Sequence, residues 1–313
     1  MAERPNAPLD LSHPGRYHVV GVGGPGMSAV ALVLAEMGHR VSGSDLRETP
    51  VLDRLRSAGV DVRIGHDRSH VDGCDAVVYS TAIPERNIEL VAAREAGLTV
   101  LHRSGLLASI CALARSIGVA GTHGKTTTSS MLMLVLASAG LRPGFVIGGD
   151  VTDTGTGAQW TGSEWLVVEA DESDFTHLSL PLEGTILTNV DVDHLENYGT
   201  FEAIVAGFER YLDQIPGPKV LCADDEICRR LASTRDVVTY GTSRGADYRA
   251  VDPRSANGSW TFGVEHRGRS LGEVSIPLRG MHNVRNATAV VAMASELGVA
   301  FEAVSYTHLT LPT

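Results

Sequence analysis

Residues 117–139 read IGVAGTHGKTTTSSMLMLVLASA, and this stretch decides how the second half of the chain is organised. The apolar run before the glycines is typical of a buried strand, and the apolar run after the threonines is typical of a helix. A glycine-rich loop between a strand and a helix presents backbone amides to phosphate groups. In such a loop Lys125 would neutralise phosphate oxygens, and the hydroxyl of Thr126 would bind Mg²⁺. The strict GxxxxGK[ST] pattern is not met because Val119 replaces its first glycine, so the loop is a variant P-loop.

Two polar clusters follow apolar runs downstream of this loop. Glu169-Ala-Asp-Glu-Ser-Asp174 ends the strand expected at Trp165–Glu169, and Thr188-Asn-Val-Asp-Val-Asp-His194 ends another. The carboxyl ends of the strands line the ligand crevice of an open α/β sheet. Carboxylates and a histidine placed there can ligate a divalent ion or polarise a phosphate. Each cluster taken alone also fits a solvated turn, but their position beside a phosphate loop favours a metal and phosphate site.

A second glycine-rich loop lies near the start of the chain. Gly21-Val-Gly-Gly-Pro-Gly26 follows a predicted strand and opens a predicted helix, and Asp45 ends the next strand. This is the context of the dinucleotide fingerprint, in which glycines let the backbone approach a diphosphate and the carboxylate binds a ribose hydroxyl. Taken alone, the motif does not separate NAD from another diphosphate ligand, and it also fits a tight strand–helix turn.

Strands and helices alternate along most of the chain, which predicts an α/β fold with mainly parallel sheets. We expect a Rossmann-like parallel-sheet domain over residues 1–115 and a P-loop-type α/β ATPase domain over residues 116–304. Short alternating strands are expected from residue 248 to 278, with Asn257-Gly258 as a hairpin turn. Residues 155–162 are rich in glycine and are expected to form a flexible loop.

Composition excludes several classes of protein. The 313 residues include 26 basic and 37 acidic side chains, a net charge of −11, which argues against a nucleic-acid partner. The four cysteines form no CxxC pair, so no zinc knuckle or redox dithiol is indicated and a reducing compartment is expected. No apolar run approaches the roughly 18 residues of a membrane span. We therefore expect a cytoplasmic protein without membrane insertion.

Taken together and in order, these motifs resemble the Mur ligase family of ATP-dependent peptidoglycan-precursor ligases. The resemblance runs from residue 17 to about residue 304. It is carried by Gly21–Ser28, Ser80–Pro84, Asn87, His102, Arg103, Gly121–Thr127, Glu169–Asp174, Thr188–His194, Asn197–Gly199, His282, Asn283, Asn286 and Ala287.

The resemblance implies an enzyme that joins L-alanine to the lactyl carboxylate of UDP-N-acetylmuramate through an acyl phosphate, with ATP and Mg²⁺. A murein-tripeptide recycling ligase of the same family is an alternative. A non-catalytic nucleotide-binding fragment is another. An NAD-dependent oxidoreductase follows from the first glycine loop alone, but it leaves residues 121–127 and Glu169 unexplained. A first loop that binds UDP would account for two phosphate loops in one chain.

The resemblance also implies roles for individual residues. The UDP-sugar would be held by Gly23, Gly24, Met27, Ser28, Asp45, Ser80, Thr81, Ala82, Ile83, Arg103 and His123. ATP would be held by Gly121, Thr122, His123, Gly124, Lys125, Thr126 and Thr127, with His282, Asn283 and Asn286 at its adenine end. The metal ligands would be Thr126, Glu169 and His194, and the catalytic groups Lys125, Asn189 and His194.

The chain departs from the family's pattern in three places. Asp191 stands where a glutamate is common, and the segment after Asp174 does not align with the usual one. The family's third, Rossmann-like domain has no counterpart here. Residues 305–313 have no helical period, so we expect a tail that is not the native continuation. We therefore expect this chain alone to bind nucleotides without forming the amide bond.

Overall fold

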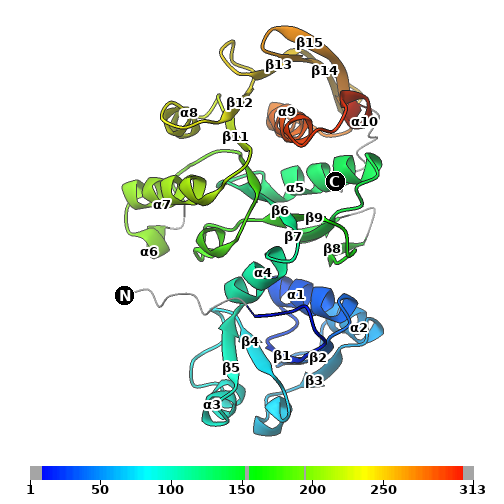
Figure 1. The fold of residues 1–313 in the computed structure, drawn as a ribbon, viewed down its shortest axis with the longest axis vertical. Helices are drawn as coiled ribbons and strands as arrows, with labels where there is room; N and C mark the ends of the chain where they lie inside the picture. The colour runs from blue at the N-terminus through cyan, green and yellow to red at the C-terminus, as the bar shows by residue number, and fades with distance from the viewer. Residues whose placement is uncertain (1–8, 152–154, 194, 306–313) are drawn as a thin grey trace. The chain divides into compact units, whose positions relative to one another are not determined.

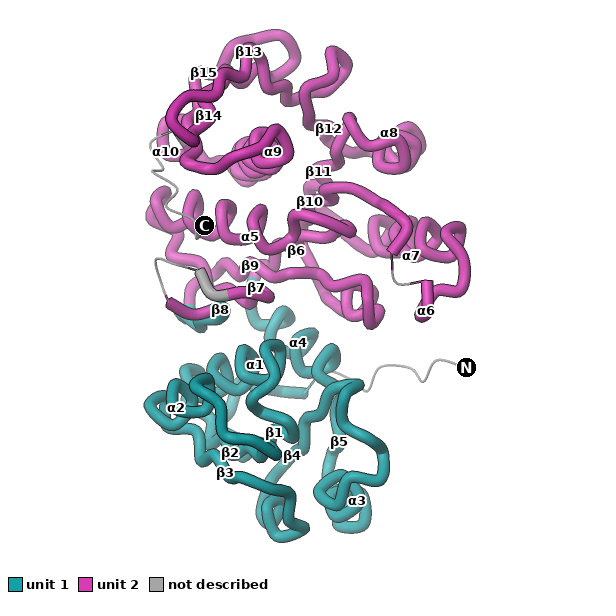
Figure 2. Tube along the Cα trace, turned by 180° about the vertical axis from the view of Figure 1, so that it is seen from behind, with its two compact units in different colours: residues 1–114, 157–162 teal, residues 115–156, 163–313 magenta. Residues whose placement is uncertain are grey.

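The computed structural model describes residues 9–151, 155–193 and 195–305. The chain divides into two compact units, shown in different colours in Figure 2. The first consists of residues 1–114 and 157–162, and the second of residues 115–156 and 163–313. Across the described ranges, none of the helices combines the length and the apolar character that a membrane span requires.

The first unit is built on a five-stranded parallel sheet of order β3-β2-β1-β4-β5 (Figure 1). Its strands are β1 (Arg16–Val20), β2 (Arg40–Asp45), β3 (Asp61–Ile64), β4 (Ala76–Tyr79) and β5 (Thr99–His102). Its helices are α1 (Pro25–Glu36), α2 (Pro50–Ser57), η1 (a 3₁₀ turn, Arg68–Val71), α3 (Ile88–Glu95) and α4 (Arg103–Cys111). The predicted parallel-sheet fold of this part is confirmed.

Local sequence explains where these elements begin. In β1 every residue from Tyr17 to Val20 is buried, which is the pattern of a parallel strand covered on both faces. Helix α1 begins at Pro25, whose ring presets a helical φ and whose missing amide proton costs nothing in a first turn. Helix α3 begins after Asn87, whose side chain accepts hydrogen bonds from two amides of the first turn.

The second unit is built on a ten-stranded mixed sheet of order β15-β14-β13-β12-β11-β10-β6-β9-β7-β8, although of β8 only Thr156 belongs to this unit. Its strands are β6 (Arg115–Ala120), β7 (Gly144–Val151), β8 (Thr156–Gln159), β9 (Trp165–Glu169), β10 (Gly184–Leu187), β11 (Lys219–Cys222), β12 (Val238–Gly241), β13 (Tyr248–Ala256), β14 (Ser259–His266) and β15 (Arg269–Ile276). Its helices are α5 (Lys125–Ser138), η2 (a 3₁₀ turn, Thr176–Ser179), α6 (Leu195–Tyr198), α7 (Phe201–Gln214), α8 (Glu226–Ala232), α9 (Met281–Glu296) and α10 (Phe301–Ser305).

Most of this second sheet is parallel. Neighbouring strands from β7 to β13 pair in parallel, whereas β13, β14 and β15 form an antiparallel meander. The predicted hairpin turn is present, because Asn257 and Gly258 both have positive φ, 52° and 82°. Helices α5 and α9 pack against each other and against strands of the sheet, and most of their side chains are buried.

The prediction of a flexible loop at residues 155–162 was wrong, because Thr156–Gln159 forms β8 at the edge of the sheet. Its sequence, TGAQ, has no alternating apolar pattern. Pairing with β7 makes it a strand, and such backbone pairing leaves no periodic signal in the side chains. Helix α10 begins at Phe301 and ends at Ser305, and residues 306–313 lie outside the described part of the chain.

Candidate functional site

The loop between β6 and α5 is shaped by two glycines in conformations that other residues rarely adopt. Gly121 has φ 121° and Gly124 has φ 85°. A Cβ atom at Gly121 would lie 2.3 Å from Thr188 Oγ1 and 2.8 Å from the carbonyl oxygen of Asn189. The loop therefore lies tightly against the chain that leaves β10, and only glycine fits at this contact.

Thr188 and Asn189 hold the middle of the loop. The amide of His123 donates to Asn189 Oδ1 (2.9 Å), and Asn189 Nδ2 donates to the carbonyl oxygen of His123 (2.8 Å). Thr188 Oγ1 donates to the same carbonyl (2.7 Å). Both ends of the Asn189 amide are thus engaged by the loop backbone. In this structure Asn189, which we expected to be a catalytic group, positions the phosphate loop.

Lys125 is paired with a buried carboxylate. Its Nζ donates to both oxygens of Glu172, at 2.9 and 3.0 Å, and to the carbonyl of Gly121 at 2.8 Å. The Glu172 side chain is 3% exposed and that of Lys125 is 16% exposed. Burial raises the pKa of Glu172, although Lys125 lowers it in part. The ammonium group thus lies at the glycine loop with an anionic partner, where a phosphate oxygen is a chemically equivalent acceptor.

Two side chains of α6 bind the backbone of the segment that carries Glu172. The Tyr198 hydroxyl donates to the Glu172 carbonyl (2.9 Å), and Asn197 Nδ2 donates to the Ser173 carbonyl (2.7 Å). In the sequence, Glu172 is one member of an acidic cluster and carries no separate signal. Its pairing with Lys125 depends on the loop geometry at the ends of two strands, which no local pattern encodes.

Glu169 fits a divalent metal. It ends β9, which pairs in parallel with β6, and its Oε1 atom is buried without a hydrogen bond. Burial raises its pKa, against the hydrogen bonds of the Thr126 hydroxyl and the Gly148 amide. A buried carboxylate oxygen without a donor, next to a hydroxyl, is an oxygen-donor set of the kind that Mg²⁺ prefers. His194, the third expected ligand, lies outside the described residues.

A cavity of about 350 Å³ adjoins the phosphate loop. His123, Thr188, Asn189 and Asp191 line it on one side, and His282, Arg285 and Asn286 of α9 on another. Helix α9 therefore brings two residues predicted for the adenine end of ATP to the phosphate loop. Asn283 does not line the cavity; its Nδ2 donates to the Arg279 carbonyl (2.8 Å) and its Oδ1 accepts from Asn286 (3.3 Å).

Four cavity residues besides Arg285 were missed from the sequence: Cys222, Asp224, Asp225 and Tyr240. Burial opposes the charge of Asp224, but hydrogen bonds from Ser243 and Thr242 hold its pKa below the usual range. Asp225 caps α8 by accepting from the amide of Cys228. Both aspartates directly follow β11, so the rule that drew attention to the polar ends of β9 and β10 would also have found them.

In the first unit, predicted ligand residues surround the loop between β1 and α1. Asp45 Oδ2 accepts a hydrogen bond from the amide of Gly23 (2.9 Å), so this carboxylate braces the glycine loop. A Cβ atom at Gly21 would lie 2.8 Å from Ile83 Cδ1, which places the turn at residues 80–83 against the loop. A Cβ atom at Gly26 would lie 2.3 Å from an Arg103 guanidinium nitrogen.

Two other residues predicted here are mostly buried. Met27 is 3% exposed and Ser28 is 8% exposed, and the Ser28 hydroxyl donates to the carbonyl of Pro25 (3.0 Å). Their backbone amides both donate to the Gly24 carbonyl, at 3.0 and 2.8 Å, so in this structure the two residues shape the start of α1. Gly24 lies in the same loop, and Ser80, Thr81 and Ala82 lie in the turn that packs on it.

Family profiles match most of the chain. The profile of the Mur ligase family, catalytic domain, matches residues 16–115. The profile of the Mur ligase middle domain matches residues 119–294, which include the phosphate loop, both strand-end clusters and α9 up to Ala294.

Curated relatives named UDP-N-acetylmuramate–L-alanine ligase share more than two fifths of the aligned residues. The protein from Bradyrhizobium diazoefficiens is 42% identical over 301 residues, which are 93% of this chain and 64% of that protein. The protein from Salinispora arenicola is 45% identical over 307 residues, which are 96% of this chain and 60% of that protein. The chain thus spans less than two thirds of the length of these relatives.

Solved structures share the fold. The UDP-N-acetylmuramate:L-alanyl-γ-D-glutamyl-meso-diaminopimelate ligase from Neisseria meningitides has a TM-score of 0.87 at 28% identity, covering 96% of this chain and 99% of that one. The UDP-N-acetylmuramate–alanine ligase from Thermotoga maritima has a TM-score of 0.83 at 30% identity, and the match covers 93% of this chain and 67% of that one.

Proposed function

This chain belongs to the Mur ligase family, and from that premise we propose that it carries the UDP-sugar and ATP sites of an enzyme that joins L-alanine to UDP-N-acetylmuramate. One observation carries the proposal. The cavity beside the phosphate loop is lined both by loop residue His123 and by His282 and Asn286 of α9. This arrangement suits a nucleoside triphosphate with its phosphates at the loop and its base beside α9.

The proposed reaction begins at the lactyl carboxylate, because a carboxylate at neutral pH does not form an amide without activation. Its oxygen attacks the γ-phosphorus of ATP, which gives an acyl phosphate and ADP. The free amine of L-alanine then attacks the acyl carbon, phosphate leaves, and the amine loses a proton. Lys125 is suited to hold the charge on the transferring phosphoryl group, since its ammonium already lies at the loop with an anionic partner.

Thr126 and Glu169 are the residues that would hold Mg²⁺. A divalent ion held by these two side chains would supply positive charge that offsets the negative charge of the phosphates. Thr188 and Asn189 support the same step indirectly, because they fix the backbone of the loop around His123. This preorganisation would fix the path of the loop backbone before ATP binds.

We propose that the first unit binds the UDP part of the sugar substrate. The support is the glycine loop braced by Asp45, with the turn at residues 80–83 beside it. A diphosphate fits a loop of this kind whether it belongs to UDP or NAD. The second phosphate loop favours UDP, because a ligase that consumes ATP needs no nicotinamide.

The recycling ligase that attaches a peptide remains the second candidate. The Neisseria structure favours it by its TM-score of 0.87, whereas identities of 42 and 45% favour the alanine ligase. The two differ in the amine that they accept. In a chain of the relatives' full length, phosphate release with L-alanine but not with a peptide would support our proposal, and the reverse would overturn it.

Calorimetric titration of the present chain tests the nucleotide sites. We expect ATP with Mg²⁺ to bind, UDP-N-acetylmuramate to bind independently of ATP, and NADH not to compete. Lys125→Met removes a charge-assisted hydrogen bond and should weaken ATP binding by about 1.5–3 kcal/mol, or roughly tenfold to a hundredfold. Binding of NADH that the UDP-sugar does not displace would contradict the assignment of the first unit.

We also propose that the protein works in the cytoplasm, without a nucleic-acid partner. All four cysteines lie in the described residues and are free thiols, which fits a reducing compartment. The net charge of −11 disfavours nucleic acid. Fractionation of cells that express a tagged form tests the location.

A further inference from the structure

We propose that the first unit holds a binding site for a divalent transition metal of the zinc type, formed by His18, His70 and Glu89. One ligand atom from each of the three lies within 4.8 Å of the other two. They come from three different elements: β1, η1 and the first turn of α3. None of them takes part in the phosphate loops, so the inference stands apart from the proposed function.

His18 presents a ligand atom that nothing else uses. The side chain is fully buried in β1, and its Nδ1 lies 2.9 Å from the Ser42 hydroxyl. This contact orients the ring so that Nε2 lies 3.5 Å from Glu89 Oε1, and Nε2 itself is buried with no hydrogen bond. Bonds of about 2.0–2.2 Å to a tetrahedral metal separate two ligand atoms by roughly 3.4 Å. The observed separation therefore already suits a shared metal.

The two oxygens of Glu89 have different surroundings. Oε1 lies 3.5 Å from His18 and 2.6 Å from His70 Nδ1. Oε2 accepts from the Ser44 hydroxyl (2.6 Å) and lies 2.8 Å from His66 Nδ1. Oε1 would face the metal, while Ser44 and His66 hold the carboxylate in place as outer partners.

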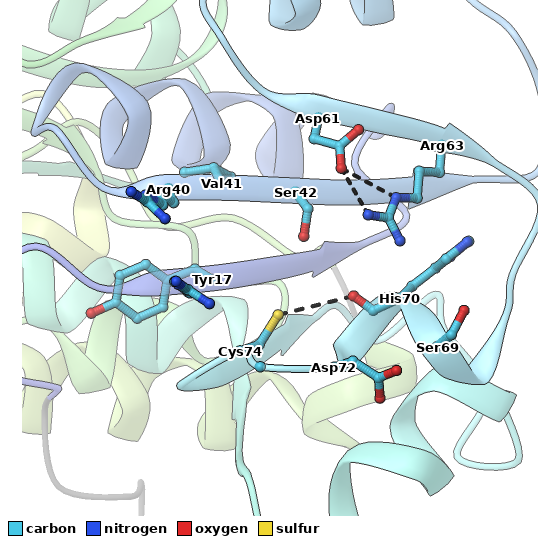
Figure 3. A pocket seen from close by; sticks show the side chains of 12 residues that line it. Tyr17, Arg40, Val41, Ser42, Asp61, Arg63, Ser69, His70, Asp72 and Cys74 are labelled. Carbon is cyan, nitrogen blue, oxygen red and sulfur yellow. Dashed lines mark hydrogen bonds and ion pairs between the residues drawn. The ribbon is translucent and has the colours of Figure 1, made fainter.

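One of the three ligand residues, His70, lines a pocket. A pocket of about 290 Å³ is lined by His70, Ser42 and Cys74 (Figure 3). The His70 side chain is 13% exposed, whereas those of His18 and Glu89 are fully buried. In the same pocket Arg63 is paired with Asp61 at 2.8 Å, which offsets its charge. Of the three ligands, His70 is therefore the one that solvent reaches.

The chemistry of the ligands selects the metal. Two imidazole nitrogens and one carboxylate suit Zn²⁺ and its neighbours in the transition series, whereas Mg²⁺ and Ca²⁺ prefer oxygen. Three protein ligands leave a fourth position for water. Protons compete for the same site, because the 2.6 Å separation between His70 and Glu89 is that of a hydrogen bond.

The test uses the whole chain, stripped of metal with a chelator and kept in excess Mg²⁺ without ATP, so that the oxygen ligands of the second unit are occupied and no nucleotide competes for zinc. ZnCl₂ is titrated by calorimetry, and CoCl₂ by its visible absorption. We expect one such site per chain, with affinity lowered by about a hundredfold or more in His18→Ala and Glu89→Gln, because ligand loss should exceed the 10–100-fold cost of an outer-partner change. His13→Ala removes an exposed histidine of the same unit and should leave binding unchanged.

Two further measurements keep the test decisive if a buried variant fails to fold. His70→Ala changes the partly exposed ligand, and X-ray absorption of the zinc-loaded wild type counts its imidazole ligands. Two imidazoles, together with loss of binding in His70→Ala, support the site. Zinc affinity that these variants do not change, or no measurable zinc binding by the wild type, would overturn it. The second result would mean that the cluster holds only protons.

Discussion

The pair formed by Lys125 and Glu172 makes a prediction that separates electrostatics from packing. Lys125→Met keeps the length of the side chain but leaves the Glu172 carboxylate, 3% exposed, without its cation. Breaking a buried pair by removing one partner costs about 3–5 kcal/mol. We expect the lower figure, about 3 kcal/mol in the free energy of unfolding, because Lys125 itself is 16% exposed.

The loss should depend on pH. Burial raises the pKa of Glu172 above its ordinary value of 4.5, and removing Lys125 removes an opposing influence. A carboxyl group with a raised pKa in the folded state binds protons more tightly there than in the unfolded state. The Lys125→Met variant should therefore lose little free energy of unfolding below pH 4.5. Above pH 4.5 the loss should grow by up to about 1.4 kcal/mol per pH unit until Glu172 is ionised.

Two matched variants complete the experiment. The double variant Lys125→Met/Glu172→Gln removes both charges and should recover stability to within about 1 kcal/mol of the wild type, with no added pH dependence. Lys219→Met changes the only other lysine, whose Nζ lies 3.4 Å from the Gly217 carbonyl, and should have little effect at any pH. The assay is urea unfolding from pH 4 to 8, followed by tryptophan fluorescence, since Trp165 and Trp260 lie in the second unit.

The reasoning would be refuted if Lys125→Met lost the same stability at pH 4 and pH 8, or if the double variant were as unstable as the single one. The double variant also serves the ATP titration. It keeps a neutral pair in the fold while lacking the cation, so weak ATP binding by it cannot be ascribed to unfolding.

Three further predictions concern other parts of the chain. Gly121→Ala should lower the free energy of unfolding by about 3 kcal/mol or more and abolish ATP binding. Gly140 has φ 82° and open space around it, so Gly140→Ala should lower it by only about 1 kcal/mol. Equal losses of the two variants in urea unfolding would contradict the tight packing of the loop at Gly121. Burial lowers the pKa of His177 to about 4, so the unfolded state takes up a proton first as pH falls. The free energy of unfolding should fall by about 3 kcal/mol between pH 6.5 and pH 4. In urea unfolding, His177→Phe should remove this part of the dependence on pH. Asp45→Ala should weaken UDP-N-acetylmuramate binding by about tenfold in calorimetry and leave ATP binding unchanged, because it releases the amides of Gly23 and Arg47, both in the first unit.

The sequence by itself determined the fold class and the positions of both phosphate loops. Apolar runs, glycines and helix-starting residues act over a few neighbours, so their pattern predicted β1, β6, α1 and α5 with small errors at the ends. The rule that ligands bind at the carboxyl ends of parallel strands also placed Glu169 and Asn189 near the loop. The site could be predicted to that extent because each motif is local.

Only the tertiary structure decided which side chains meet. Lys125 pairs with Glu172, Asn189 binds the backbone of His123, and Asn286 of α9 lies beside Gly124. These contacts join segments far apart in the chain, and they depend on strand order and helix packing rather than on any short pattern. The same holds for β8, which is a strand because of its partner. It holds equally for His18 and Glu89, which the parallel sheet and α3 bury next to each other.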